Sequence, residues 1–117
     1  MDKFTQGYIE CAVWSSTSDD GTPIDSTNAE LAPETITRME SDCQTFQHVN
    51  AELLGRADEQ MYPARQGHDF WLTRNGHGAG FWDGDYDKDL GQALTAASKK
   101  FGECDLYVGD DGLIYIA

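Results

Sequence analysis

The side chains best suited to acid–base chemistry lie in one stretch of the chain, residues 67–83. A histidine there could act as a general base and an arginine could bind an oxyanion, which is the equipment of a small hydrolase or a metal-dependent enzyme. No serine or cysteine, however, has a nucleophile context such as G-x-S-x-G, and the histidines lack the H-E-x-x-H spacing. We therefore predict no catalytic residue, no metal ligand and no cofactor. The enzyme remains the alternative, with four candidate residues: His68, Asp69, His77 and Asp83.

A second candidate is a run in which every other residue is an aspartate, from Asp83 to Asp89. The run is similar to a calcium loop, but Lys88 stands at its sixth position and Leu94 at its twelfth, where such a loop needs Gly and Glu. In an extended chain, residues two apart lie about 6.6 Å from each other on one face, so these carboxylates could imitate a row of phosphates. Together with two aspartates of an earlier loop they form the predicted partner-binding set: Asp19, Asp20, Asp83, Asp85, Asp87 and Asp89.

The overall charge favours this second use of the acids. The 117 residues include 21 Asp and Glu against 8 Lys and Arg, a net charge of −13. Such a field repels the phosphate backbone of nucleic acids and the surface of anionic membranes. We therefore predict no direct nucleic-acid binding, no membrane association, and a partner protein with a basic surface.

The compartment is predicted from the N-terminus and the cysteines. Residues 1–6 show no basic run followed by an apolar block, so we expect no signal peptide. Cys11, Cys43 and Cys104 are odd in number, far apart and without a C-x-x-C pair, which is typical of buried thiols in a reducing cytosol.

The pattern of apolar residues predicts the elements that must position these side chains. Helical spacing indicates a helix over residues 4–15, a long helix over about 33–60, and a third helix over about 90–101. Residues 68–82 look like a hairpin around Asn75-Gly76, and residues 105–116 look like a second hairpin around a turn at 109–112. We expect an α+β fold, with three helices packed on an antiparallel sheet of about four strands. The whole chain, 1–117, forms one domain with a flexible acidic loop at about 16–28.

Several of these motifs occur together in a known group of proteins. The run 68–83, the ending 107–115 and a helix that opens at 32–35 resemble a family of small acidic hypothetical proteins encoded by tailed bacteriophages. The resemblance implies a phage origin and the host bacterial cytoplasm. It transfers no catalytic or binding residue, because the family has no assigned activity.

These observations lead to one main hypothesis and three alternatives. The chain is expected to be a phage accessory protein, not an enzyme, that binds and modulates a host protein. In the sharpest form it imitates DNA and inhibits a defence factor or another protein that handles nucleic acid. The alternatives are the hydrolase described above, a component of the virion or of its assembly, and, for the oligomeric state, a homodimer through a hairpin edge.

Overall fold

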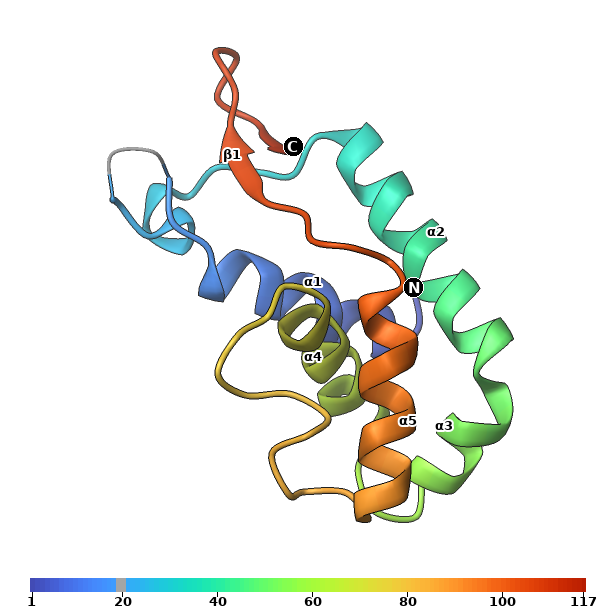
Figure 1. Ribbon diagram of the computed structural model, residues 1–117. Helices are drawn as coiled ribbons and strands as arrows, with labels where there is room; N and C mark the ends of the chain where they lie inside the picture. The colour runs from blue at the N-terminus through green and yellow to red at the C-terminus, as the bar shows by residue number, and fades with distance from the viewer. Residues whose placement is uncertain (19–20) are drawn as a thin grey trace.

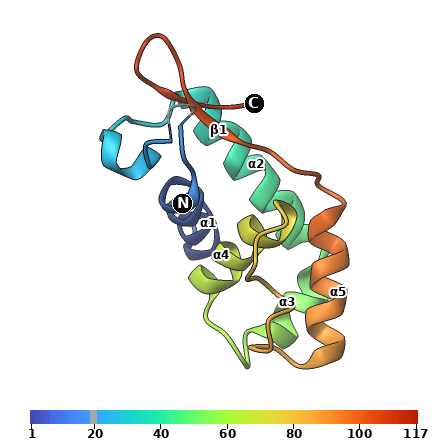
Figure 2. The same ribbon diagram turned by 60° about the vertical axis from the view of Figure 1, so that its left-hand side comes forward.

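The computed structural model describes residues 1–18 and 21–117, which form an elongated molecule of 43 × 25 × 22 Å (Figure 1). Two helices, α1 and α4, cross near its centre, and a small β-hairpin lies at one end (Figure 2). Helices α3 and α5 lie at the opposite end. The elements are α1 (Lys3–Ser15), η1 (Ile24–Thr27), α2 (Pro33–Val49), α3 (Ala51–Ala57), α4 (Pro63–Arg74), α5 (Lys88–Lys99), β1 (Leu106–Val108) and β2 (Ile114–Ile116).

Two glycines allow the central helices to approach at backbone distance. A Cβ atom on Gly7 of α1 would overlap the carbonyl oxygen of Ala64, and a Cβ atom on Gly67 of α4 would overlap that of Phe4. No side chain other than the hydrogen of glycine fits at either position without moving a backbone. The glycine in front of His68 is therefore a helix-packing residue.

Aromatic rings fill the space that this crossing leaves. Phe46 of α2 stacks on Phe70 of α4 at 4.1 Å between ring centroids, and Tyr8 of α1 lies 5.1 Å from the same ring. Phe81, from the loop after α4, stacks on Phe46 at 6.1 Å. All four side chains are buried, so the core is built mainly from α1, α2 and α4.

The predicted hairpin at residues 68–82 is wrong. Residues 68–74 belong to α4, which begins at Pro63, and almost every residue from 66 to 74 is buried. A helix buried on all sides shows no 3.6-residue alternation, and this is why the stretch looked like a strand. Asn75 ends the helix with its side chain donating to the carbonyl of Trp71, and Gly76 follows with φ +69°, so this pair is a helix C-cap and not a hairpin turn. The strand expected at 79–82 is an irregular loop.

The predicted long helix at 33–60 is broken into two. α2 ends at Val49, where the side-chain amide of Asn50 donates to the Phe46 carbonyl and competes with the helical bond, and α3 then runs only to Ala57. The expected four-stranded sheet is also wrong, because β1 and β2 form the sheet by themselves among the described residues. Residues 1–18 and 21–117 are therefore mostly helical, with five α-helices and one two-stranded sheet, in place of the three helices on a four-stranded sheet that the sequence predicts.

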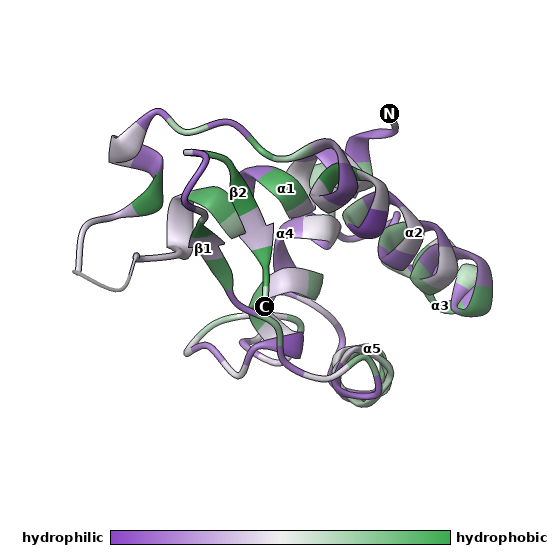
Figure 3. Cartoon of the chain, turned by 90° about the horizontal axis from the view of Figure 1, so that it is seen from above, coloured by the Kyte–Doolittle hydropathy of each residue, from purple (hydrophilic) through white to green (hydrophobic). Residues whose placement is uncertain are grey.

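The other predicted elements are confirmed. The first helix is α1, the third helix is α5, and the second hairpin pairs Leu106 with Ile116 and Val108 with Ile114. Hydrophobic residues recur along both strands (Figure 3). β2 is also held on its other side, since the N–H of Ile114 donates to the carbonyl of Glu30.

Candidate functional site

The loop before α5 and the turn before α4 meet at one end of the molecule. The side-chain amide of Gln60 donates to Asp87 at 2.7 Å, and the backbone N–H of Asp87 donates to the carbonyl oxygen of the Gln60 side chain at 2.8 Å. These two hydrogen bonds join two acidic segments that lie 27 residues apart. We call these two joined segments, residues 58–60 and 83–89, the acidic end; the acids that they carry are Asp58, Glu59, Asp83, Asp85, Asp87 and Asp89.

The four aspartates of the loop do not form the evenly spaced row that an extended chain would give. Residues 83–86 follow a series of bends, with φ +103° at Gly84. Asp83 accepts from the backbone N–H of Gly80, and Asp85 forms an ion pair with Arg65 at 3.3 Å. Local bonds therefore hold Asp83, Asp85 and Asp87, and they do not hold them in a regular row. Asp19 and Asp20, the other two predicted partner-binding residues, lie outside the described residues.

Behind the acidic end lies a buried carboxylate. Asp69 is fully buried on α4, where it accepts from the hydroxyl of Tyr86 at 2.7 Å and from Arg65 at 3.3 Å. Burial raises the pKa of Asp69, while the Tyr86 hydrogen bond and the Arg65 charge act in the opposite direction. Arg65 thus serves a buried acid and an exposed one, and it neutralises only part of the local charge.

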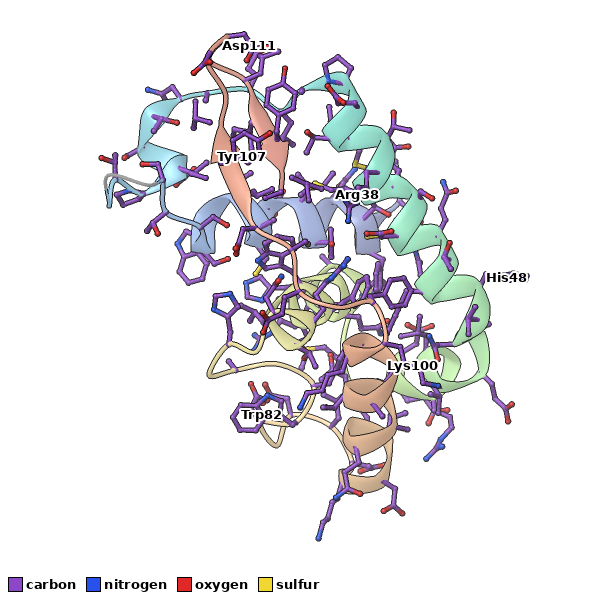
Figure 4. All side chains as sticks on the ribbon, turned by 45° about the horizontal axis from the view of Figure 1, so that its top comes forward. Arg38, His48, Trp82, Lys100, Tyr107 and Asp111 are labelled. Carbon is purple, nitrogen blue, oxygen red and sulfur yellow. The ribbon has the colours of Figure 1, made fainter. Side chains whose placement is uncertain are left out.

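An aromatic side chain stands exposed beside the acidic end. Trp82 is 52 % exposed and points outward from the loop before α5 (Figure 4). It borders a largely apolar cleft of ≈ 290 Å³. The other residues that line this cleft are Phe81, Gly84, Tyr86, Asp87, Lys88, Gly91 and Gln92. An exposed tryptophan beside an apolar hollow, ringed by charge, is the arrangement found at protein–protein hot spots.

The structure sets one of the four residues of the hydrolase alternative, His77, apart from the other three. Asp69 and Asp83 lie near Arg65, and the charges of Asp69 and Arg65 also act on His68, whose ring faces Trp14 of α1 at 6.1 Å between centroids. His77 lies beyond the C-terminal end of α4 and lines the cleft beside residues 104–107, which is not the cleft beside Trp82. Within residues 1–18 and 21–117, no group of three His, Cys, Asp or Glu side chains could hold a metal ion. The four residues therefore do not meet at one site in the described part of the chain.

Arg74 is the residue whose role the sequence did not reveal. It is buried, its guanidinium donates to Asp42, to the Tyr8 hydroxyl and to the carbonyls of Phe101 and Gly102, and it lies over the Phe70 and Phe101 rings. These contacts connect α1, α2, α4 and the segment after α5. Arg74 is therefore a structural centre and not an exposed oxyanion-binding group. Its position inside an apolar run was the one available signal.

The cysteines are buried free thiols, as predicted. Cys11 lies on α1, Cys43 on α2, and Cys104 just before β1. Burial raises the pKa of all three, to about 12 for Cys11. At neutral pH the thiols are protonated and unreactive.

Comparisons with protein-family models, curated proteins and solved structures found no match to this chain. The resemblance to a phage family consequently stays a prediction. No helix in the described part of the chain is long and apolar enough to cross a membrane.

Proposed function

We propose that this chain is a binding protein whose acidic end occupies a basic surface on another protein. One observation carries the proposal: the Gln60–Asp87 bonds join two acidic segments, and Asp87 lines the same cleft as the exposed Trp82. Acids that serve only solubility would do so at any exposed position, so they would not need to be held together. An exposed tryptophan beside an apolar cleft gives up the favourable free energy of burying its apolar surface. A partner that covered the side chain would regain that free energy.

The two parts of the surface would make different contributions. The acids would speed the encounter with a basic partner and reject acidic ones, and this contribution falls as salt is added. Trp82 and the cleft bordered by Phe81 and Tyr86 would supply contact area that salt does not weaken. The acids at the acidic end outnumber the nearby cations Arg65 and Lys88, so the surface keeps a net negative charge.

On the phage resemblance we extend the proposal to the nature of the partner. The partner would be a protein of the bacterial host cytoplasm, and its basic surface would be one that otherwise holds nucleic acid. The acids imitate phosphates here through their density on a folded surface, because the loop lacks the regular spacing of a nucleic-acid strand.

A pair of matched double variants tests the proposal. Trp82→Ala with Asp89→Asn removes one exposed tryptophan and one charge from the acidic end, and neither side chain makes a hydrogen bond or ion pair among the described residues. Trp14→Ala with Glu10→Gln removes the same groups from α1, where Trp14 is 66 % exposed. Each protein is used to capture partners from host-cell lysate at about 0.1 and 0.5 M salt, and the captured protein is then purified and titrated directly.

The expected result is a basic protein retained by the wild type and the α1 variant and lost from the acidic-end variant. Its binding should weaken at the higher salt, and the wild type should displace a labelled DNA duplex from it. Equal retention by both double variants would show that the acidic end does not bind the partner. Retention without displacement of DNA would exclude nucleic-acid imitation and leave the binding function in place.

A further inference from the structure

The β-hairpin leaves one of its edges free. The N–H of Ala117 donates to the carbonyl of Asp105, and the N–H of Gly109 donates to that of Leu113, so residues 105, 107 and 109 face β2 with their hydrogen-bonding groups. The backbone groups of Leu106 and Val108 must then point away from β2. In the part of the chain that the structure describes, no hydrogen bond from either of these two N–H groups is found. β1 therefore presents two donors and two acceptors in the spacing of a β-ladder.

A cleft runs beside β1. It has a volume of ≈ 600 Å³, within the range that binds ligands, and residues 104–107 line it together with residues 15–18 and the end of α4. The segment 15–18 is itself extended: Ile24 N–H donates to the Ser16 carbonyl, so Thr17 directs its own backbone groups to the other side. An extended chain in this cleft would find ladder partners on β1 and the backbone groups of Thr17 opposite.

The charge of the cleft selects the kind of chain. Its lining includes the exposed carboxylate of Asp105 and contains no Lys or Arg. Asp105 and Tyr107 lie two residues apart and share one face of β1, and the Tyr107 ring is 40 % exposed and stacked on Tyr115. A basic side chain lying over the Tyr107 ring with its charge at Asp105 would satisfy both groups.

We propose that the cleft between β1 and residues 15–18 binds an extended, basic segment of a partner protein, which adds a strand to the free edge of β1. This surface is distinct from the acidic end, since Tyr107 and Trp82 lie toward opposite ends of the molecule (Figure 4). The proposal therefore stands independently of the function proposed above. Strand addition obtains affinity from main-chain bonds and selectivity from alternate side chains.

Charge also argues against a second copy as the occupant. Pairing the edges of two identical chains would bring together two molecules of net charge −13 and place Asp105 near the partner's own acids. A homodimer through this edge is therefore an outcome of the test and not the inference.

The probe is the peptide acetyl-Lys-Val-Arg-Val-Lys-amide, titrated into the whole protein and followed by amide NMR. Two further versions carry N-methyl groups on the two valines or on the three basic residues, because alternate N–H groups of a strand face opposite edges. An acidic version, with Glu in place of Lys and Arg, tests the charge. We expect the basic peptide to bind, at least one N-methylated version to lose binding, and the acidic version not to bind. Hydrogen exchange at Leu106 and Val108 should slow on binding.

Protein variants locate the site. Val108→Pro removes an outward N–H without removing a bond to β2, and should weaken binding by about two- to tenfold. Asp105→Asn should weaken it by about two- to fivefold, while Asp110→Asn, the matched charge at the tip of the turn, should leave it unchanged. The variant Trp82→Ala with Asp89→Asn should bind the peptide as the wild type does.

Three results would overturn the inference. Undiminished binding of both N-methylated peptides would exclude strand addition, even if Val108→Pro failed to fold. Slowed exchange at residues 83–89 in place of Leu106 and Val108 would assign the peptide to the acidic end. Sedimentation of the free protein as a dimer that Val108→Pro dissociates would show that a second copy occupies the edge.

Discussion

Two arginines stand near opposite ends of α4 and have opposite surroundings. Arg74 is buried, with Tyr8, two carbonyls and the rings of Phe70 and Phe101 around it, and it forms an ion pair with Asp42. Arg65 is one-third exposed and faces two carboxylates, Asp69 and Asp85, with Asp83 close by.

One helix thus carries an arginine whose donors are used inside the protein and another that lies in the surface where we propose that a partner binds. At Arg74 nearly every donor meets an acceptor inside the protein, so nothing is left for a partner. At Arg65 the acids exceed the cation, and the surplus is exposed beside Trp82. Substitutions at the two ends of α4 would test whether the two arginines differ in this way.

The largest effect is expected from removing the closed-in arginine. Arg74→Met leaves Asp42, the Tyr8 hydroxyl and two carbonyls without their donor, and should lower the free energy of unfolding by about 3–5 kcal/mol in urea titration. Arg74→Lys keeps the positive charge but not the several N–H donors of the planar guanidinium. This variant should recover part of the lost free energy of unfolding. A loss below about 1 kcal/mol for Arg74→Met would mean that this end of α4 is no more structural than the other.

The helix crossing that supports both arginines should be nearly as sensitive. Gly67→Ala forces a methyl group against the Phe4 carbonyl, and should cost about 1–3 kcal/mol or more of unfolding free energy. Gly55→Ala in α3 is the control, because its Cβ would meet nothing within 4 Å. That change should raise stability by about 0.5–1 kcal/mol. Equal effects of the two substitutions in thermal and urea unfolding would disprove the close packing of α1 on α4.

The buried acid behind the acidic end should make stability depend on pH. Because burial raises the pKa of Asp69 in the folded state, folding favours its protonated form, and its contribution to stability falls as pH rises from about 3.8 through that raised pKa. Asp69→Asn cannot lose a proton. The variant should therefore gain stability relative to the wild type as the pH rises from about 3.5 to 7, through that raised pKa. A constant difference across this range, measured by urea unfolding, would show that the pKa of Asp69 is not raised.

The smallest effect is expected from removing the open arginine. Arg65→Gln breaks pairs that are partly exposed, and should cost less than about 1 kcal/mol. It also withdraws the cation that lowers the pKa of Asp69, so NMR titration of that carboxyl should show a further upward shift. A cost as large as that of Arg74→Met would erase the contrast between the two ends of α4.

The elements that expose one face to water could be predicted from the sequence. α1, α5 and the final hairpin alternate apolar and polar residues at their own periods, and each lies where that pattern predicts it. α4 is buried on nearly all sides, so its sequence carries no such period, and the meaning of Gly67 depends on α1, sixty residues earlier. Asn50 and Asn75 end helices through side-chain bonds that resemble turn signals in a single sequence.

The candidate site was predictable in composition but not in geometry. The excess of acid between Asp83 and Asp89 is visible in the sequence, yet its junction with residues 58–60 depends on Gln60, which carries no charge and no motif. The exposure of Trp82 could not be foreseen either, because its neighbour Phe81 is fully buried. Which of two adjacent aromatic residues faces water is decided by the loop and not by residue type.

The three buried thiols can report local opening of the fold at three positions. Cys11, Cys43 and Cys104 lie in three separate parts of the chain, and each is protonated and shielded until its own segment opens. The rate at which each thiol is alkylated therefore measures how often α1, α2 or the segment before β1 opens, and no cysteine has to be introduced. Followed with and without a bound partner, the three rates would show which part of the protein a ligand holds shut.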